Sequence, residues 1–454
     1  MQDTIAAIST AYGEGGIGII RISGENALSI LNKIFVTKSD LENRKMTYGH
    51  IKNPYTNEIV DEVLAVYMKA PHTYTTEDVV EINCHGSIVS LKKTLELCYD
   101  AGAVPAERGE FTKRAFLGGR LDLSQAEAVI DMIKAKTDKG FDIAINQLEG
   151  RLSKKIRDIR KNILDILVDI TVNIDYPDED IDVIIYDNLK KDVIRIFQNI
   201  KGLLDSYERG RILKEGLNVS IIGKPNVGKS SLMNALLQES RAIVTEIPGT
   251  TRDTISESMN IDGIPILITD TAGIRETENE IEKIGIIKSK ESFNKADLII
   301  YMLDASVPLT EEDKEIASLL GDRPAVTLLN KTDLPTCIDE KDIRKIAPKG
   351  EIIPVSIIKE EGVFQIKEAI KKQVFEGKTY QKDSLTVVNE RHKNILKTAL
   401  SHLNDAKHAI EINEPLEIIE IDIDTVYNLL GEIIGETVSD DVLDEVFSRF
   451  CLGK

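Results

Sequence analysis

Residues 223–230 read Gly-Lys-Pro-Asn-Val-Gly-Lys-Ser, which fits the pattern G-x-x-x-x-G-K-S. An apolar run at 219–222 predicts a strand before this loop, and 231–237 predicts a helix after it. In that context the glycines let the backbone curl, so that its N–H groups face phosphates at a helix N-terminus. We expect Lys229 to reach the β- and γ-phosphates and the Ser230 hydroxyl to hold Mg²⁺. The predicted loop contacts are Asn226, Val227, Gly228, Lys229, Ser230 and Ser231.

A second motif, Asp270-Thr271-Ala272-Gly273, follows the apolar run 265–269. An acid at the end of a strand is placed to hold the Mg²⁺ shell, and the glycine amide can meet a γ-phosphate. The stretch 249–253, Gly-Thr-Thr-Arg-Asp, lies between the two motifs, where a switch loop would supply Thr251 to Mg²⁺. The contacts predicted from these segments are Thr245, Glu246, Ile247, Pro248, Gly249, Thr250, Thr251, Asp270, Thr271, Ala272 and Gly273.

A third motif, Asn330-Lys331-Thr332-Asp333, bears on the choice of base. A carboxylate there can accept hydrogen bonds from N1–H and the exocyclic amine of guanine. Adenine has an acceptor at N1 and no amine at C2, so Asp333 favours GTP over ATP. Ser356 ends the last apolar run, where another base-contacting loop would begin. Each motif alone is a common turn, but together, in this order, they predict a GTP-hydrolysing enzyme. We expect nucleotide contacts from Asn330, Lys331, Asp333 and Ser356.

The position after the second motif lacks a residue that Ras-like enzymes use. Those enzymes place a glutamine there to orient the attacking water, and this chain has Ile274. The candidates that follow are Glu276, Glu278, Glu280 and Glu282. The same acids can be solvated residues at a helix start, where the helix dipole favours them, and the pattern leaves both readings open.

The composition limits the partners and the compartment. The chain has 57 Lys and Arg against 76 Asp and Glu, a net charge of −19. Proteins that hold nucleic acid through many phosphates usually have a basic excess, so RNA contact must come from a local patch or a partner protein. No apolar run approaches the ~18 residues of a membrane span, and the first residues lack the features of a signal peptide. Four scattered cysteines fit neither a disulfide framework nor a zinc site. We expect a cytoplasmic protein without membrane contact.

The first predicted segment, residues 1–118, is an α+β domain. Strands are expected at 18–22, 60–68 and 79–84, and one helix at 88–101.

Helical spacing then begins at Ser124, which forms a capping-box pattern with Glu127. The predicted helical domain has a first segment at 119–213 and a second at 379–454. In the second, residues 389–449 again have helical spacing, with interruptions expected at Pro415, Gly431 and Gly435. The insert, 214–378, alternates short apolar strands with helices, as buried parallel sheets do. The predicted fold is multidomain: an α+β N-terminal domain, a discontinuous α-helical domain and an inserted α/β P-loop G domain of the Ras-like type.

With these motifs in place, the chain resembles the tRNA-modification GTPase MnmE (TrmE) family over nearly its whole length. Outside the insert, the resemblance rests on GGIGIIRISG at 15–24, EINCHG at 81–86, GEFTKRAF at 109–116, LDLSQAEA at 121–128 and FCLGK at 450–454. A G domain inserted in a helical domain, with Cys-x-Gly-Lys after it, is highly specific to that family.

The resemblance implies that residues 1–118 bind folate and form a homodimer. It implies an FAD-dependent partner of the MnmG (GidA) type, in a heterotetramer or larger complex, that works with the protein on the wobble uridine of certain tRNAs. The pair would install an aminomethyl or carboxymethylaminomethyl group at uridine C5, with a one-carbon unit from 5-formyltetrahydrofolate or another tetrahydrofolate derivative. Delegating tRNA binding to the partner would suit the acidic charge.

Residue by residue, the resemblance implies K⁺ ligands at Asn226, Thr245, Ile247 and Thr250. A cation there would take the charge-neutralising role of an arginine finger. Glu282 matches the water-orienting acid, and Arg275 would assist it. The implied folate contacts are Arg21, Glu81, Arg120 and Lys454. Many relatives have lysine at the position of Arg120, and Ser87 replaces a glycine of the family's usual His-Gly-Gly.

Simpler readings stand beside these. Arg21 can be an outward-facing strand residue, and 451–454 can be a frayed tail. Cys84 and Cys98 lie in apolar runs typical of core thiols, whereas Cys451 lacks such a pattern and is the candidate for chemistry as nucleophile, redox group or positioning residue.

Two alternative functions compete with tRNA modification. A ribosome-assembly or regulatory GTPase switch would share the nucleotide motifs but usually carries a basic RNA-binding segment. A folate-binding scaffold would leave Cys451 and Lys454 without a role.

Overall fold

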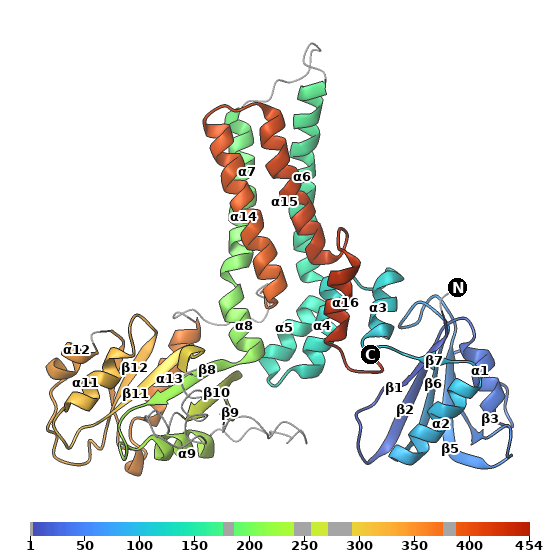
Figure 1. Cartoon of the computed structure of the whole chain (residues 1–454), viewed down its shortest axis with the longest axis horizontal. Helices are drawn as coiled ribbons and strands as arrows, with labels where there is room; N and C mark the ends of the chain where they lie inside the picture. The colour runs from blue at the N-terminus through green and yellow to red at the C-terminus, as the bar shows by residue number, and fades with distance from the viewer. Residues whose placement is uncertain (1–2, 176–185, 240–255, 271–292, 348, 376–386) are drawn as a thin grey trace, which may run out of the picture. The chain divides into compact units, whose positions relative to one another are not determined.

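The computed structural model describes residues 3–175, 186–239, 256–270, 293–347, 349–375 and 387–454 (Figure 1). The chain forms two compact units. One comprises Met1–Ile130, Gln147–Gln198 and Ile395–Lys454, and the other comprises Asp131–Asn146 and Asn199–Asn394. Among the described helices, none combines the length and the apolar character that a membrane span requires.

A mostly antiparallel sheet opens the first unit. Its strands lie in the order β3-β4-β5-β6-β2-β1-β7, and only the pair β1–β7 is parallel. Because side chains alternate along a strand, Ile20 and Ile22 face the core under two helices, while Arg21 points to the other face. The strands are β1 (Ile5–Ile8), β2 (Gly15–Ser23), β3 (Phe35–Val36), β4 (Thr47–Lys52), β5 (Ile59–Met68), β6 (Val79–Gly86) and β7 (Val104–Pro105).

Helices α1 (Ala27–Ile34) and α2 (Ile88–Asp100) cover the core face of this sheet (Figure 1). The three predicted strands and the predicted helix at 88–101 are confirmed. The expectation of a single helix before residue 118 is wrong, because α1 and α3 (Glu110–Leu117) also form. Each has only eight residues, too few for the periodicity to stand out from the strands around it.

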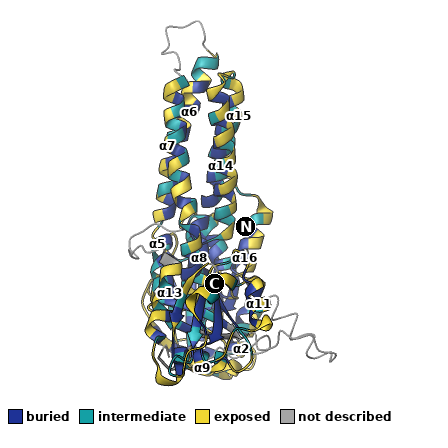
Figure 2. Ribbon diagram, turned by 90° about the vertical axis from the view of Figure 1, so that its left-hand side faces the viewer, coloured by how far each residue is buried: buried dark blue, intermediate teal, exposed yellow. Residues whose placement is uncertain are grey.

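Long helices follow in both segments that flank the insert. Helices α6, α7, α14 and α15 run side by side, and their buried faces turn toward one another (Figure 2). The remaining helices are shorter. The long and short helices of the two segments are α4 (Leu123–Lys134), α5 (Asp138–Leu148), α6 (Arg151–Asp175), α7 (Tyr186–Asp205), α8 (Tyr207–Glu215), α14 (Glu390–Glu411), α15 (Leu416–Ile434) and α16 (Asp440–Ser448).

Two details of the helical prediction are corrected. Ser124 lies inside α4, and Asp122 caps the helix instead. The Asp122 carboxylate accepts from the Gln125 N–H at 3.0 Å, while the Gln125 side chain accepts from the Asp122 N–H at 3.0 Å. Gly431 does not interrupt α15. The Thr437 hydroxyl and the buried guanidinium of Arg160 lie against it, and a Cβ there would be only 2.8 Å from Thr437 Oγ1 and 3.1 Å from Arg160 Nη2.

The second unit contains a six-stranded sheet in the order β13-β12-β11-β8-β10-β9, parallel except for the antiparallel pair β9–β10. Helices α9 and α13 cover one face, and α11 and α12 cover the other. The strands are β8 (Leu217–Ile222), β9 (Ser256–Ile261), β10 (Ile264–Asp270), β11 (Leu298–Asp304), β12 (Ala325–Asn330) and β13 (Glu351–Pro354). The helices are α9 (Lys229–Glu239), α11 (Glu311–Ser318), α12 (Glu340–Ile346), the 3₁₀ turn η1 (Ile357–Lys359) and α13 (Val363–Phe375).

This doubly covered parallel sheet confirms the α/β fold predicted for the insert. Five of its strands match the apolar runs of the sequence at 219–222, 265–269, 298–303, 326–329 and 352–355, whereas β9, which reads SESMNI, lacks such a run and is not predicted by the sequence. The carboxyl ends of β8, β10, β11 and β12 meet at one edge of the sheet, which is where open α/β sheets bind ligands.

Candidate functional site

The loop between β8 and α9 has the geometry that the first motif predicts. Gly228 has φ +106°, and a Cβ at that position would collide with the Asn330 side chain. The Lys229 ammonium donates to the carbonyl oxygens of Gly223 at 2.7 Å and Lys224 at 2.8 Å. The lysine therefore lies across its own loop, at the N-terminus of α9, where a phosphate would be received.

Two contacts anchor this loop to the rest of the sheet. The Asn330 amide donates to the Val227 carbonyl at 2.7 Å, which joins the first motif to the third. On the other side, the Lys224 ammonium lies 2.6 Å from the carboxylate of Asp313, which is buried in the first turn of α11. The sequence does not predict the role of Asp313, because its partner Lys224 lies 89 positions away in the chain and no motif links the two residues.

The base-recognition loop follows β12. The Ser356 hydroxyl donates to the Asp333 carboxylate at 2.7 Å, so the two predicted residues lie together. This hydrogen bond lowers the pKa of Asp333, which keeps the carboxylate ionised and ready to accept from a guanine edge. Asn330 supports the same loop, since its side-chain oxygen accepts from the Ile357 N–H at 3.2 Å.

Lys331 also has a partner that the sequence analysis did not name. Its ammonium lies 2.5 Å from the carboxylate of Asp304, the last residue of β11. Burial opposes ionisation of Asp304, but hydrogen bonds from Lys331 and Ser306 outweigh it and lower the pKa of that carboxyl. The pair holds the β11 and β12 ends together beside the nucleotide edge.

Several predicted nucleotide and catalytic residues lie outside the described residues. They are Thr245, Glu246, Ile247, Pro248, Gly249, Thr250, Thr251, Thr271, Ala272, Gly273, Arg275 and Glu282. Only the backbone of Asp270 is described, as the last residue of β10. Asn226 has φ +65°, and the Ser230 and Ser231 side chains are exposed at the start of α9.

A second group of predicted residues comes together in the first unit. Arg21 and Glu81 are register partners on β2 and β6, and the guanidinium donates to the carboxylate at 2.8 and 2.9 Å. Both side chains are mostly buried. Arg21 is therefore not a solvated strand residue.

The tail after α16 lies against the same sheet. Ser9, just after β1, donates to the Gly453 carbonyl at 2.9 Å, and Arg108 forms a β-bridge with Leu452. Gly453 has φ +84°, and any Cβ there would overlap the Ile8 carbonyl. Only glycine fits so close an approach, so the tail is docked rather than frayed.

Docking brings Lys454 near the predicted folate residues. Burial lowers the pKa of Lys454, the nearby Arg21 lowers it further, and Glu81 and Cys451 oppose that effect. Cys451 is exposed, whereas Cys84 and Cys98 are buried and have thiol pKa values raised by burial to about 12. The two buried thiols match their interpretation as core residues.

The fourth predicted residue, Arg120, joins the group through an aromatic side chain that the sequence analysis did not name. Tyr74 lies under both guanidiniums, with its ring centroid 5.3 Å from Arg21 Cζ and 4.8 Å from Arg120 Cζ. Arg120 also donates to the Tyr74 carbonyl at 3.2 Å. No sequence signal distinguishes Tyr74 from other tyrosines.

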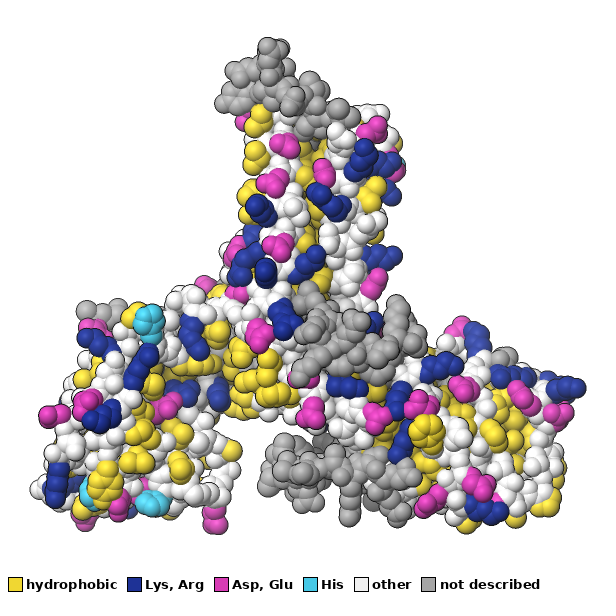
Figure 3. All heavy atoms as spheres, turned by 180° about the vertical axis from the view of Figure 1, so that it is seen from behind, with side chains coloured by type: hydrophobic (Ala, Val, Ile, Leu, Met, Phe, Trp, Pro, Cys, Tyr) yellow, Lys and Arg dark blue, Asp and Glu magenta, His cyan; other side chains and the backbone are white. Residues whose placement is uncertain are grey.

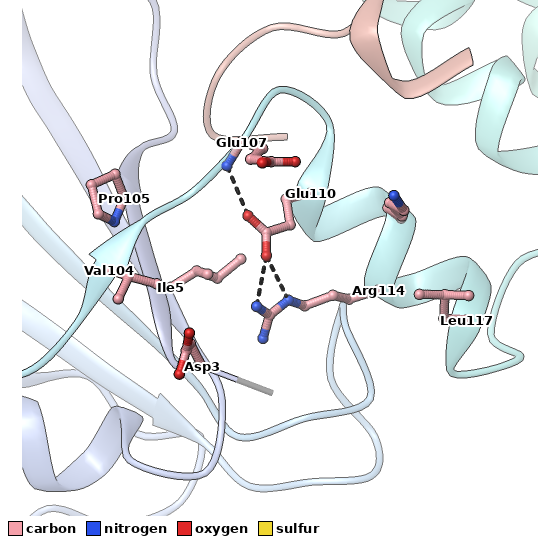
Figure 4. Close-up of a pocket in the computed structure, with 9 residues that line it drawn as sticks. Asp3, Ile5, Val104, Pro105, Glu107, Glu110, Arg114 and Leu117 are labelled. Atoms are coloured by element: carbon pink, nitrogen blue, oxygen red, sulfur yellow. Dashed lines mark hydrogen bonds and ion pairs between the residues drawn. The ribbon is translucent and has the colours of Figure 1, made fainter. Parts of the chain in front are cut away.

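A hollow of about 460 Å³ lies elsewhere on this unit, between the β7 edge and α3 (Figure 4). Its cations are already paired: Arg114 turns toward Glu110, at 2.7 Å, and Lys113 binds Asp444 at 2.6 Å. None of the four predicted folate residues lines it. The hollow is therefore separate from the predicted site.

These features define the class of the protein. The parallel sheet has a phosphate-binding loop after its first strand, β8. After β12 it has a carboxylate placed to accept hydrogen bonds from guanine. A protein with this combination is a P-loop GTPase. The comparisons with known proteins give the family. Residues 4–120 match the family described as "GTP-binding protein TrmE N-terminus", and residues 123–451 match "MnmE helical domain". The chain therefore belongs to the MnmE family of tRNA modification GTPases, and it is a GTP hydrolase.

Relatives of known name extend over the full chain. The tRNA modification GTPases MnmE of Alkaliphilus metalliredigens and Alkaliphilus oremlandii are 55% and 52% identical to it, over 100% of both chains. That of Clostridioides difficile is 52% identical, also over 100% of both. Among solved structures, the FeoB G-domain from Methanococcus jannaschii is 26% identical, covering 34% of this chain and 96% of that one. Its TM-score of 0.26 is too low to compare the two folds.

Proposed function

We propose that the protein uses GTP hydrolysis to drive modification of the wobble uridine in certain tRNAs. It works with an FAD-dependent MnmG (GidA)-type partner and adds an aminomethyl or carboxymethylaminomethyl group at uridine C5. The carbon comes from a tetrahydrofolate derivative. The observation that best supports this proposal is the docked tail, because it brings Lys454 beside Arg21 and Glu81.

The charges of this group fit a folate. Arg21, Arg120 and Lys454 supply three cations against the single carboxylate of Glu81. Among the described residues, Arg120 forms no ion pair. Folates carry carboxylates that such cations bind and a pterin ring with N–H donors that a carboxylate accepts. Glu81 would hold the pterin, and Arg120 and Lys454 would hold the carboxylates.

The GTP site is proposed to use Mg²⁺, held by Ser230 and Thr251, and K⁺, held by Asn226, Thr245, Ile247 and Thr250. Two G domains of a homodimer come together around these ions, and Glu282 orients the attacking water with help from Arg275. The potassium ion replaces the charge of an arginine finger.

The surface charge favours tRNA binding mainly through the complex with the partner. On the face in Figure 3, acidic and basic side chains are interspersed along the helices and do not gather into a broad basic patch. The net charge of −19 points the same way. We place the protein in the cytoplasm.

Replacing Lys454 with alanine tests the folate assignment. The variant keeps Gly453 and its docking contact with Ser9, so the tail stays in place. Removing a half-buried cation that binds a carboxylate is expected to weaken 5-formyltetrahydrofolate binding by about 10- to 100-fold, from ~1.5–3 kcal/mol per charge-assisted bond. Isothermal titration calorimetry measures the affinity, and nucleoside mass spectrometry measures wobble modification in a complemented deletion strain. Both should fall, and GTP turnover should not.

The matched control is Arg449→Ala, which also removes a cation near the C-terminus. Among the described residues, the Arg449 side chain pairs with the exposed Glu445 at the end of α16. It should leave folate binding and modification unchanged. Deleting 451–454 should reproduce the loss seen for Lys454→Ala. If the deletion variant still binds folate and modifies tRNA, the site assignment is wrong.

A further inference from the structure

Two guanidiniums share one aromatic ring in the first unit. The Arg21 and Arg120 Cζ atoms lie 5.3 and 4.8 Å from the centroid of Tyr74. Like charges repel, and Arg21 is neutralised by Glu81, whereas Arg120 has no acidic partner among the described residues. Its recorded contacts are the ring and carbonyl of Tyr74. Among the described residues, Tyr74 thus makes both contacts that hold the Arg120 side chain, one through its ring and one through its carbonyl.

The ring of Tyr74 is itself held in place. Its hydroxyl shares a hydrogen bond of 2.9 Å with the hydroxyl of Thr112, a buried residue of α3. The ring packs against the cluster of Ile5, Ala7, Ala106 and Phe111. Phe111 also lies under Arg21, at 5.6 Å. The tyrosine is therefore a fixed platform and not a mobile surface group.

The segment that carries the platform, residues 73–78, is tied down by a polar network. The buried hydroxyls of Ser23 and Thr75 are 2.6 Å apart. Ser23 also donates to Glu77 at 2.6 Å, and buried Arg114 donates to both Glu77 oxygens at 3.1 Å. This network joins the segment to β2 and α3. The network holds Tyr74 in place relative to the sheet. Because Arg120 contacts the ring and the carbonyl of Tyr74, it also holds the Arg120 guanidinium in place.

We propose that Tyr74 is a positioning residue of the folate site. Its ring and carbonyl hold the exposed Arg120 guanidinium beside Arg21, preorganised to receive a carboxylate of the ligand. This inference rests on the proposed function, since it deepens the assignment of Arg21, Glu81, Arg120 and Lys454. A cation held on a ring face loses less rotational freedom on binding, so the ligand binds more tightly.

The test compares Tyr74→Met with Tyr74→Phe in the full-length protein, with 5-formyltetrahydrofolate as the ligand. Methionine fills similar space without a ring, so the Tyr74→Met variant should bind the ligand about 5- to 30-fold more weakly, the range of a cation–π contact that becomes desolvated when the ligand covers the exposed Arg120. Phenylalanine keeps the ring and should stay within about threefold of wild type. Tyr55→Leu, at an exposed tyrosine of the same domain, is the matched control and should change nothing.

A double-mutant cycle separates positioning from general damage to the fold. If Tyr74 acts through Arg120, then Tyr74→Met combined with Arg120→Met should bind no worse than Arg120→Met alone, within about twofold. Additive losses in the cycle would overturn the inference, as would equal binding by wild type and Tyr74→Met. Arg120→Met leaves the ring intact, so the loss it causes can be read even if Tyr74→Met folds poorly. An unchanged affinity in Arg120→Met would also overturn the inference.

Binding measurements on the wild type and the variants distinguish a failure of the proposed function from a failure of the role assigned to Tyr74. If wild-type protein binds no 5-formyltetrahydrofolate, the folate site itself is wrong, and the inference falls with it. If wild type binds and Lys454→Ala binds weakly while Tyr74→Met binds normally, only the role of Tyr74 is wrong. GTP turnover, measured in every variant, should stay at the wild-type rate, because the nucleotide loops belong to the other unit.

Discussion

Among single residues, Asp333 is the one that selects guanine over adenine. Its carboxylate is held by Ser356 and stays ionised because that hydrogen bond lowers its pKa. The folded-state pKa lies below the ordinary value, so the charge persists as the pH falls until the lowered pKa is reached. Guanine recognition should therefore be independent of pH through the neutral range.

Changing Asp333 to asparagine should exchange guanine for xanthine. The amide oxygen can still accept from Ser356, so the loop keeps its geometry, while the amide N–H₂ suits the C2 carbonyl of xanthine. GTP affinity should fall by at least about 100-fold, since two bonds to a charged acceptor worth ~1.5–3 kcal/mol each are lost. Fluorescent-nucleotide titration measures this. Asp322→Asn, at an exposed acid, is the control. Undiminished GTP binding by Asp333→Asn would refute the base assignment.

The role of a residue can be predicted from the sequence when it arises from a local motif. Lys229, Asp333 and Ser356 belong to motifs whose spacing reflects one local chemistry, and the structure places them at one edge of a sheet. Asp313 and Tyr74 act through partners far away in the chain. Their roles come from tertiary packing, which no local pattern encodes.

At the scale of elements, strands were predicted well where both faces are buried. The sequences of β8, β11 and β12 are mostly apolar, whereas β9 (SESMNI) is mostly polar and does not predict a strand. The start of α4 was misplaced because Ser124 and Asp122 both suit a cap, and the hydrogen bonds of Asp122 decide between them. Gly431 predicts a helix break because glycine disfavours helices, and its packing role emerges only from the tertiary structure.

Gly431 gives a test of that packing role. Its absent side chain makes room for the Thr437 hydroxyl and for Arg160. Arg160 is buried, stacks 4.0 Å over the Tyr427 ring and donates to the Tyr427 carbonyl at 3.1 Å. Because Arg160 is held at several points, Gly431→Ala should lower the free energy of unfolding by about 1–3 kcal/mol, as overpacking does. Urea denaturation followed by circular dichroism measures the change.

Gly202 of α7 provides the opposite control. It is a helical glycine with open space where a Cβ would lie, so Gly202→Ala should stabilise by about 0.5–1 kcal/mol. If Gly431→Ala also stabilises the protein, the close approach of Arg160 does not matter for stability.

For the protein as a whole, the missing glutamine at Ile274 and the match of Asn226 and 245–250 to the family's potassium positions together predict that hydrolysis depends on a monovalent cation and on a second G domain. GTP turnover should be at least about tenfold faster in KCl than in NaCl at equal ionic strength, because the cation offsets charge in the transition state. Steady-state phosphate release measures it, and with GDP and aluminium fluoride the two G domains of the homodimer should come together only in KCl. Equal rates in the two salts would rule this mechanism out.

The docked tail also bears on how the protein is made. Ser9 and Gly453 are 444 positions apart, and Arg21 emerges from the ribosome long before Lys454. Domains tend to fold as they are synthesised, N-terminal first, so the sheet of β1–β7 can form before the tail has been made. Residues 451–454 dock onto it last. A nascent chain stalled anywhere earlier would thus carry a finished sheet without Lys454, and it would lack one of the four residues of the proposed folate site.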